Sequence, residues 1–260
     1  MTTVTNGEVL KGRVALISGA AGRLGADFAR AILAESGKVC LVDISERGKI
    51  LFKSEIEAGN ACFVQADTTV SEEIDLAITH CNDQFGKLDA AVHCAYPVSS
   101  QWGTRFEDIR SDLLSQDLSS QLGGAIIFSQ SLIRTFREQG GGHLVHIASI
   151  HGIAAPKFWH YKGTTIASPI EYSAIKSGVI AITRYLAKYC KDEGIQVNCI
   201  SPGGIKDDQP TEFLDRYRQS CNTKGMLESQ DVAGALIFLL SKQSRFITGQ
   251  NIVVDDGWSL

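Results

Sequence analysis

The chain lacks the features of a membrane protein, a secreted protein or a nucleic-acid-binding protein. None of its apolar runs approaches the roughly 18–20 residues needed to cross a bilayer, so no membrane partner is expected. Its N-terminus, Met1–Glu8, has neither the basic start nor the apolar core of a signal peptide. It contains no run of lysine and arginine, and its net charge is −4. This charge argues against a nucleic-acid partner.

Signals for metal ions and disulfides are also missing. The seven cysteines are an odd set without a Cys-x-x-Cys pair, and most lie in apolar segments. They indicate reduced, buried thiols in a cytoplasmic protein rather than metal ligands. Proline is scarce, with 5 residues in 260, whereas glycine reaches 25 and hydrophobic residues 44%. This composition is typical of a globular protein, and no linker divides the chain.

Short apolar runs alternate with segments of helical spacing, such as Leu24, Phe28 and Ile32. Runs of this length that are rich in valine and isoleucine are typical of strands buried on both faces of a parallel sheet. The expected strands are Val14–Ser18, Val39–Asp43, Cys62–Ala66, Leu88–Cys94, Leu144–Ser149, Gln196–Ser201 and Asn251–Asp255. The pattern predicts a single α/β domain over residues 1–260. Its Rossmann-like, doubly wound parallel sheet should have about seven strands, with helices on both faces.

Three irregular segments interrupt this rhythm, each after an expected strand. Tyr96–Arg105 is polar and aromatic, residues 152–170 show no clear periodicity, and Pro202–Pro210 leads into a polar helix. Loops longer than about 12–15 residues are uncommon in compact domains and are usually functional. Open α/β sheets bind ligands at the carboxyl ends of their strands. We therefore expect residues 152–170 to form a substrate loop and residues 205–228 to form a lid.

A glycine-rich turn joins the first expected strand to the first expected helix. Gly19, Gly22 and Gly25 follow the pattern G-x-x-G-x-x-G, with Arg23 and Leu24 before the last glycine. Glycines let the backbone approach a pyrophosphate, whose charge is met by amides at a helix N-terminus. The turn therefore predicts a dinucleotide site, although many such turns carry glycine for packing alone.

Asp43 ends the second expected strand, 18 residues after Gly25. A carboxylate there accepts hydrogen bonds from the adenosine ribose and repels a 2′-phosphate, which favours NAD over NADP. Two other interpretations stay open. Asp43 caps the next helix, or Arg23 and Arg47 pair with a 2′-phosphate.

A tyrosine and a lysine lie four residues apart in a segment with a clear helix start. Ser168 and Glu171 are spaced as a capping box, with Pro169 at the expected first helical position. Tyr172 and Lys176 then share one face near the helix N-terminus. An ammonium beside a phenol lowers the phenol's pKa from about 10 and suits it to proton exchange near neutral pH. An amphipathic helix face explains the spacing equally well.

In their order along the chain, these motifs resemble the short-chain dehydrogenase/reductase family from about Lys11 to Ser259. The resemblance is carried by the glycine turn, Asp43, Ile147-Ala148-Ser149, Tyr172-Ser173-Ala174-Ile175-Lys176, Ser201-Pro202-Gly203-Gly204-Ile205 and the closing run Ile247–Asp255. It implies an NAD(P)-dependent oxidoreductase that interconverts a secondary alcohol and a ketone. It also implies a homodimer or homotetramer, with subunit contacts through helices around Ile109–Phe136 and Tyr172–Tyr189.

The resemblance also implies roles for individual residues. Tyr172 would be the general acid/base, Lys176 would hold the nicotinamide ribose, and Ser149 would bond the substrate oxygen. Gln121 falls where the family has a catalytic asparagine that positions a relay water, and its side chain is one methylene longer. The remaining implied cofactor contacts are Asp67 and Thr68 at the adenine, Ala95 beside the cofactor, and Pro202, Gly203 and Ile205 near the carboxamide.

The chain departs from the family pattern in several places. His93-Cys94-Ala95-Tyr96 stands where Asn-Asn-Ala-Gly is usual, and Asp256 replaces a glycine of the closing Asp-Gly-Gly. The interval from Ser149 to Tyr172 is 23 residues, longer than usual.

Aromatic and cationic side chains of this insert and of the loop after Ala95 would suit a sugar or an anion, since rings stack on sugars and cations pair with phosphate. The candidate substrate residues are Tyr96, Trp102, Arg105, Lys157, His160, Tyr161 and Lys162. The alternative is a solvated loop whose rings pack on the body of the protein or on a neighbouring subunit.

A weaker resemblance concerns the substrate. Fragments of the chain are similar to oxidoreductases of bacterial surface-sugar and flagellin-modification pathways, namely Ala95-Tyr96-Pro97, Trp102–Asp108, Gly163-Thr164 and Ser168-Pro169. This similarity implies a polar or phosphorylated sugar-type substrate. Two alternatives remain. One is a family member that acts on an apolar ketone or alcohol, and the other is an NAD-binding subunit that has lost catalysis.

Overall fold

The computed structural model describes residues 7–260 and is built on a seven-stranded parallel sheet with the order β3-β2-β1-β4-β5-β6-β7. The strands are β1 (Val14–Ser18), β2 (Lys38–Asp43), β3 (Ala61–Gln65), β4 (Ala90–His93), β5 (Gly142–Ile147), β6 (Ile195–Pro202) and β7 (Asn251–Val254). Each strand lies within two residues of the run that predicted it, so the doubly wound α/β fold is confirmed. Residues 1–6 lie outside the described residues. They belong to the N-terminal segment, Met1–Glu8, in which no signal peptide was expected.

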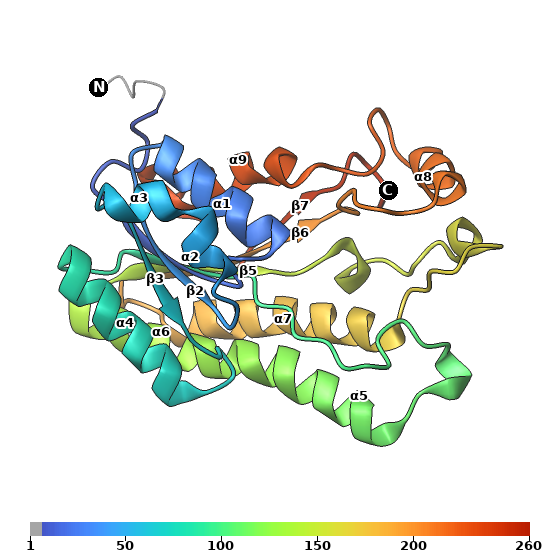
Figure 1. Ribbon diagram of the computed structural model, residues 1–260, viewed down its shortest axis with the longest axis horizontal. Helices are drawn as coiled ribbons and strands as arrows, with labels where there is room; N and C mark the ends of the chain where they lie inside the picture. The colour runs from blue at the N-terminus through green and yellow to red at the C-terminus, as the bar shows by residue number, and fades with distance from the viewer. Residues whose placement is uncertain (1–6) are drawn as a thin grey trace.

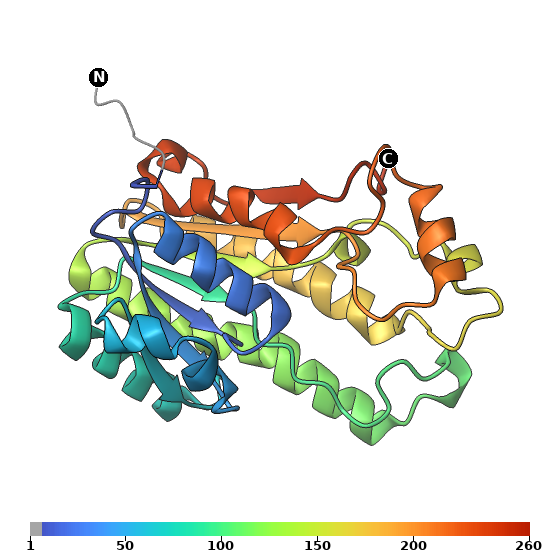
Figure 2. The same cartoon turned by 45° about the horizontal axis from the view of Figure 1, so that its top comes forward.

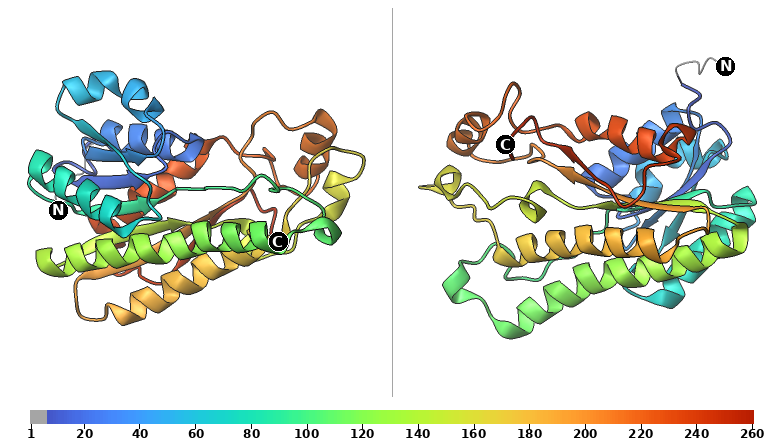
Figure 3. Two further views of the ribbon diagram at one scale, coloured as in Figure 1. Left: turned by 60° about the horizontal axis from the view of Figure 1, so that its bottom comes forward. Right: turned by 180° about the vertical axis from the view of Figure 1, so that it is seen from behind.

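Helices cover both faces of the sheet (Figures 1 and 3). One face carries α1 (Arg23–Ala34) and α9 (Ser229–Leu240), with α2 (Arg47–Leu51) and α3 (Lys53–Glu57) near its edge. The other face carries α4 (Ser71–Phe85), α6 (Gly124–Gln139) and α7 (Ile170–Tyr189). Since successive side chains of a strand point to opposite faces, Ile17 of β1 belongs to the core under α1 while Leu16 belongs to the core under α4.

The chain reverses its direction of progress across the sheet at β1, which pairs with β2 on one side and β4 on the other. At such a switch point the flanking crossovers leave opposite faces and open a crevice at the carboxyl ends of the strands. The loop at 96–105, the insert at 152–170 and α8 (Thr211–Arg218) all extend beyond this edge (Figures 1 and 2). The C-terminus ends beside α8.

The predicted capping box at the start of α7 is wrong. The helix begins at Ile170 with Pro169 as its N-cap residue and no side-chain cap. The hydroxyl of Ser168 instead lies 3.3 Å from Nδ1 of His151. Glu171 is buried, and neither carboxylate oxygen has a hydrogen-bond partner among the described residues. The insert brings His151 back against Ser168, and this contact replaces the local one.

Two further expectations concern burial and membranes. Five of the seven cysteines are buried and the other two are half-buried, as the apolar segments around most of them predicted. Between residues 7 and 260, no helix combines the length and the apolar character needed to span a membrane.

Candidate active site

A cavity of about 1080 Å³ lies beyond the carboxyl ends of the central strands. It runs from the ends of β2 and β3, past the glycine turn after β1, to the ends of β4 and β5 and the start of α7. Most of the predicted site residues line it: Gly19, Gly22, Arg23, Leu24, Gly25, Asp43, Asp67, Thr68, Ala95, Tyr96, Ser149, Tyr161, Tyr172, Lys176, Pro202, Gly203 and Ile205. Gln121, Trp102, Arg105, Lys157, His160 and Lys162 do not. Its size and its place at the switch point are those of a ligand site in this fold class.

The glycine turn has a geometry that side chains would block. Gly19 has φ +66°, and a Cβ there would lie 2.8 Å from the amide nitrogen of Ala95. A Cβ on Gly25 would lie 2.2 Å from the carbonyl oxygen of Gly19. The N-cap of α1 is Gly22, which has no side chain to occupy the first amides of the helix. The turn is therefore a bare backbone cradle at a helix N-terminus, and it fits the pyrophosphate of a dinucleotide.

Asp43 holds this cradle against the end of β2. Its Oδ2 accepts a hydrogen bond from the amide of Ala21 at 2.8 Å, and its Oδ1 accepts one from Ser45 at 2.9 Å. The N-cap residue of α2 is Glu46, so Asp43 does not cap that helix. Its carboxylate lines the cavity at the point where the ribose of a dinucleotide in the glycine cradle would lie.

Lys176 and Tyr172 lie side by side at the other end of the cavity. The Lys176 Nζ atom donates a hydrogen bond to the carbonyl of Ile147 at 2.9 Å and lies 5.7 Å from the centre of the Tyr172 ring. Burial lowers the pKa of Lys176 to about 8. Burial also raises the pKa of Tyr172, an effect that a hydrogen bond with Ser149 partly offsets. The expected lowering of the Tyr172 pKa by Lys176 is therefore wrong for the chain alone, because burial is the largest influence and the group that lowers this pKa is Ser149.

Ser149 and His151 complete this end of the site. Ser149 Oγ accepts a hydrogen bond from the amide of His151 at 3.2 Å, so its own hydroxyl proton serves the hydrogen bond with Tyr172 and would pass to a substrate oxygen bound there. The His151 ring stands edge-on to Tyr172, with ring centres 5.7 Å apart. Burial lowers the pKa of His151 to about 4, so the ring is neutral at physiological pH. Sequence reasoning missed His151, although its position two residues after Ser149 was a usable signal.

Three aromatic rings meet edge-to-face around the phenol of Tyr172. The ring centres of Tyr96 and Trp102 lie 5.8 and 6.0 Å from that of Tyr172 and 5.4 Å from each other. The ring of Tyr96 also lies 5.3 Å from the Lys176 ammonium. Edge-to-face packing of this kind orients the rings. The unusual Tyr96 thus helps to fix the position of the Tyr172 ring.

Gln121 lies behind this cluster in a π-helical turn, Leu118–Gly123, between α5 (Ser111–Asp117) and α6. It is only 4% exposed, and both polar atoms of its side chain lack a hydrogen-bond partner among the residues described. Buried amides are nearly always satisfied, often by an ordered water. The position thus suits an amide that holds a water, the role that the family resemblance implies for it.

The insert turns most of its charged side chains away from the cavity. Lys157 Nζ donates to the carbonyl of Trp258 at 2.7 Å, and His160 Nε2 lies 3.0 Å from the hydroxyl of Ser220. Arg216 of α8 donates to the carbonyls of His160 and Lys162. The insert at 152–170, α8 and the C-terminal tail therefore form one roof over the substrate end of the cavity.

Segment 205–228, predicted as a lid, forms most of this roof. Four of its residues that sequence reasoning did not single out line the cavity, namely Gln209 and the largely apolar Phe213, Tyr217 and Met226. Its leading end is held by an ion pair between Arg23 of the glycine turn and Asp207, and Arg23 also donates to the carbonyl of Lys206. The apolar character of these lining residues gave no signal in the sequence, because it resembles ordinary helix packing.

Comparison with known proteins agrees with this geometry. A family model described as enoyl-(acyl carrier protein) reductase matches residues 19–259. The chain is 37% identical over 256 residues to post-translational flagellin modification protein A of Campylobacter coli, covering 97% of this chain and 100% of that protein. The chain belongs to the short-chain dehydrogenase/reductase family.

A second relative and a solved structure are also similar to this short-chain dehydrogenase/reductase. The 7alpha-hydroxysteroid dehydrogenase of Bacteroides fragilis is 31% identical over 255 residues, with 95% of each chain covered. A short-chain dehydrogenase from Leptospira borgpetersenii, solved with bound NAD+, has a TM-score of 0.89 and 29% identity. The match covers 100% of this chain and 98% of that one. As a member of this family, the protein is a dehydrogenase or reductase.

Proposed function

We propose that the protein is an NAD-dependent oxidoreductase that interconverts a secondary alcohol and a ketone. The observation that carries this proposal is the convergence of Ser149, Tyr172 and Lys176 at one end of a cavity that also contains the bare glycine cradle. A bound nicotinamide would supply the hydride acceptor. Asp43, Asp67 and Thr68 line the same cavity beyond the glycine cradle, where the adenosine part of a dinucleotide would lie.

The protein's own residues handle the proton. In the oxidation direction, the substrate hydroxyl donates its proton to the deprotonated Tyr172 oxygen as the carbon gives up a hydride and the C=O bond forms. Ser149 donates a hydrogen bond to the same substrate oxygen and stabilises the negative charge that develops there. With the cofactor bound, the charge of an oxidised nicotinamide would add to that of the Lys176 ammonium, and both would favour the phenolate form of Tyr172. In reduction these proton movements reverse.

The preference for NAD rests on Asp43. Its carboxylate faces the cavity where a 2′-phosphate would add two negative charges. Arg23, one of the two cations that would favour NADP, is engaged by Asp207, which supports NAD further. Arg47 remains on the cavity wall. Dissociation constants for NAD and NADP, measured by calorimetry on the same preparation, test the preference, and tighter binding of NADP contradicts it.

For the substrate we propose a polar, sugar-type alcohol or ketone of bacterial glycan biosynthesis. The 37% identity to flagellin modification protein A supports this class. Tyr96 and Tyr161 offer ring faces to a sugar on the cavity wall. We also propose a cytoplasmic enzyme, consistent with its free cysteines.

An apolar ketone or alcohol is the second candidate. The roof side of the cavity is lined by Ile150, Ile166, Phe213 and Met226, and the cationic insert residues do not line it. The relative named 7alpha-hydroxysteroid dehydrogenase favours the same candidate. A subunit without catalysis is disfavoured, because Ser149, Tyr172 and Lys176 are all present and line one cavity.

A substrate panel decides between these candidates. Reduction of NAD is followed with sugar phosphates, nucleotide sugars, hydroxysteroids and cyclic terpene alcohols, and oxidation of NADH with the matching ketones. Turnover confined to the sugars supports the proposal, and turnover confined to steroids or terpenes selects the second candidate. NAD binding without turnover of any compound would favour the non-catalytic subunit.

We further propose a homodimer or homotetramer. Tyr185 and Tyr189 stack on the outer face of α7, with ring centres 5.9 Å apart, and are 68% and 57% exposed. Ile126 of α6 is half exposed on the neighbouring helix. Sedimentation velocity tests this expectation, and a monomer at micromolar concentration contradicts it.

A further inference from the structure

Asp256, for which the sequence suggested no role, has an unusual backbone conformation just after β7. Its φ is +54°, in the left-handed region that favours glycine, and glycine is the residue that the family pattern has there. Among other residues, aspartate and asparagine tolerate this region best. The chain thus keeps the backbone shape of the usual glycine and adds a carboxylate to it.

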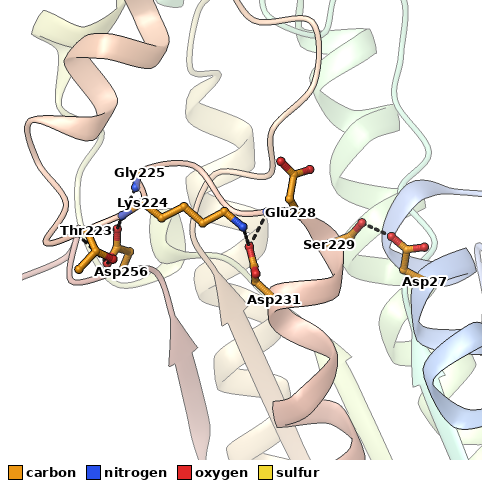
Figure 4. Close-up of polar contacts among 8 residues, drawn as sticks. All are labelled: Asp27, Thr223, Lys224, Gly225, Glu228, Ser229, Asp231 and Asp256. Carbon is orange, nitrogen blue, oxygen red and sulfur yellow. Dashed lines mark hydrogen bonds and ion pairs between the residues drawn. The ribbon is translucent and has the colours of Figure 1, made fainter. Parts of the chain in front are cut away.

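That carboxylate accepts several hydrogen bonds from one short segment (Figure 4). The amides of Thr223, Lys224 and Gly225 donate to it at 3.0, 2.5 and 2.8 Å, and the Thr223 hydroxyl adds a fourth bond at 2.7 Å. The backbone carbonyl of Asp256 accepts a fifth bond, from the amide of Asn222 at 2.8 Å. The Gly225 amide, the Thr223 hydroxyl and the other amides lower the pKa of Asp256 to about 2, so the tether is charged at any assay pH.

The tethered segment, Asn222–Gly225, joins the two parts of the lid that line the cavity. On its N-terminal side α8 presents Tyr217, and on its C-terminal side Met226 follows directly. The Tyr217 ring stacks on Trp258, two residues beyond Asp256, with ring centres 5.8 Å apart and planes at 20°. The C-terminal tail therefore holds this part of the lid at two points.

The lid has further contacts along α8 and at its neck. The amide of Gly204 donates a hydrogen bond to the Tyr217 hydroxyl at 2.6 Å, and Arg216 of α8 donates to the carbonyls of His160 and Lys162. Leu227 pairs with Ile205 in a short parallel bridge. Lys224 forms an ion pair with Asp231 in the first turn of α9, and Ser229 bonds to Asp27 of α1 (Figure 4). These bonds fix where the lid leaves the body of the protein. The Asp256 tether and the Trp258 stack act together with the contacts of α8 to orient its cavity-lining face, and the tether holds the segment between Tyr217 and Met226.

We propose that Asp256 is a positioning residue for the substrate, which holds Tyr217 and Met226 on the cavity wall by tethering Asn222–Gly225. The inference rests on the proposed function for its kinetic part only. The tether contacts no residue of the glycine cradle, and neither Ser149 nor Tyr172 is among its partners. Loss of the tether should therefore alter substrate binding and leave the chemistry and the cofactor site in place.

The test uses Asp256→Gly, which keeps the left-handed backbone and removes only the carboxylate. Asp192→Gly is the matched control, because Asp192 also has a left-handed backbone, with φ +67°, and its side chain is 83% exposed in the turn before β6. Hydrogen exchange of the peptides that contain residues 211–225 should be about 10- to 100-fold faster in Asp256→Gly, the range expected when charge-assisted hydrogen bonds are lost. Asp256→Asn, which keeps an acceptor oxygen, should recover part of this protection.

The kinetic readout uses the substrate that the panel identifies. KM should rise about tenfold in Asp256→Gly, while kcat and the NAD dissociation constant stay within about twofold of wild type, and Asp192→Gly should change none of them. Faster exchange with an unchanged KM overturns the positioning role, and unchanged exchange overturns the tether itself. If the wild-type protein turns over no compound, the proposed function fails, and exchange of α8 alone then confirms or overturns the claim that Asp256 holds the lid.

Discussion

Replacement of the buried Lys176 by methionine should stabilise the protein at neutral pH. A lysine in the unfolded chain keeps its proton up to about pH 10.5, whereas burial lowers the pKa of Lys176 to about 8 in the folded protein. One pKa unit corresponds to about 1.4 kcal/mol, so burying the charged form costs about 3 kcal/mol at pH 7. Methionine removes this cost and gives up the hydrogen bond to Ile147, which contributes about 1 kcal/mol. The net expected gain is about 2 kcal/mol.

The pH dependence of this gain is the stricter part of the prediction. Between about pH 8 and 10.5 the unfolded state binds more protons at Lys176 than the folded state does, so the stability of the wild type rises with pH in this window. By about pH 9.5 the wild type should recover about 2 kcal/mol, and the variant and the wild type should then be about equally stable. Packing differences do not depend on pH and cancel in this comparison.

Urea unfolding followed by tryptophan fluorescence, at one protein concentration and at about pH 7 and pH 9.5, measures both effects. Lys188→Met is the control, because Lys188 is exposed on the same helix and its replacement removes no buried charge. A difference between wild type and Lys176→Met that stays constant from pH 7 to 9.5, or grows, would refute the reasoning.

Three further predictions concern the cofactor and the proton path. Asp43→Asn should remove a repulsion of about 1–4 kcal/mol between the Asp43 carboxylate and the 2′-phosphate of NADP at roughly 4 Å. In calorimetry, the ratio of the NADP dissociation constant to the NAD dissociation constant should therefore fall at least about fivefold. Gln121→Leu should lower kcat about tenfold at an unchanged NAD dissociation constant, with Gln121→Asn close to wild type; equal rates for all three argue against a bound water there. Asp207→Asn breaks an exposed pair with Arg23 that contributes less than about 1 kcal/mol to stability. Stopped-flow measurements should nevertheless show faster NAD release, and an unchanged release rate contradicts a lid held shut by this pair.

Sequence patterns predicted the sheet and both ends of the cavity because those features are local. Buried parallel strands can be recognised in a sequence as short apolar runs. The glycine turn after β1 can be recognised because its backbone path leaves no room for a Cβ at Gly19 or Gly25. Helical spacing places Tyr172 and Lys176 on one face of a helix, and the resemblance to the family, which rests on all the motifs in order, assigned them to the site. The single domain, the strand order around β1 and the cavity at the switch point then follow from general rules of α/β folds.

Features that depend on distant segments were not predictable in this way. Ser168 has the spacing of a helix cap, but the insert brings His151 to it. The Tyr172 pKa was expected to fall because of a near neighbour and instead rises because of burial by the surrounding chain. Lys157 has the chemistry of an anion site, yet the carbonyl of Trp258, about a hundred residues away, binds it. In each case the result depends on packing between segments that are far apart in the sequence, which a local sequence pattern cannot predict.

The most direct test of the account is Tyr172→Phe, measured for cofactor binding and turnover on one preparation. Phenylalanine keeps the ring contacts with Tyr96, Trp102 and His151 and removes only the phenol oxygen. The account predicts an NAD dissociation constant within about twofold of wild type by calorimetry, and a loss of turnover of about 10²- to 10⁴-fold with the panel substrate, the range for a general acid/base. Turnover close to that of the wild type would contradict the assignment of Tyr172 as the group that carries the proton.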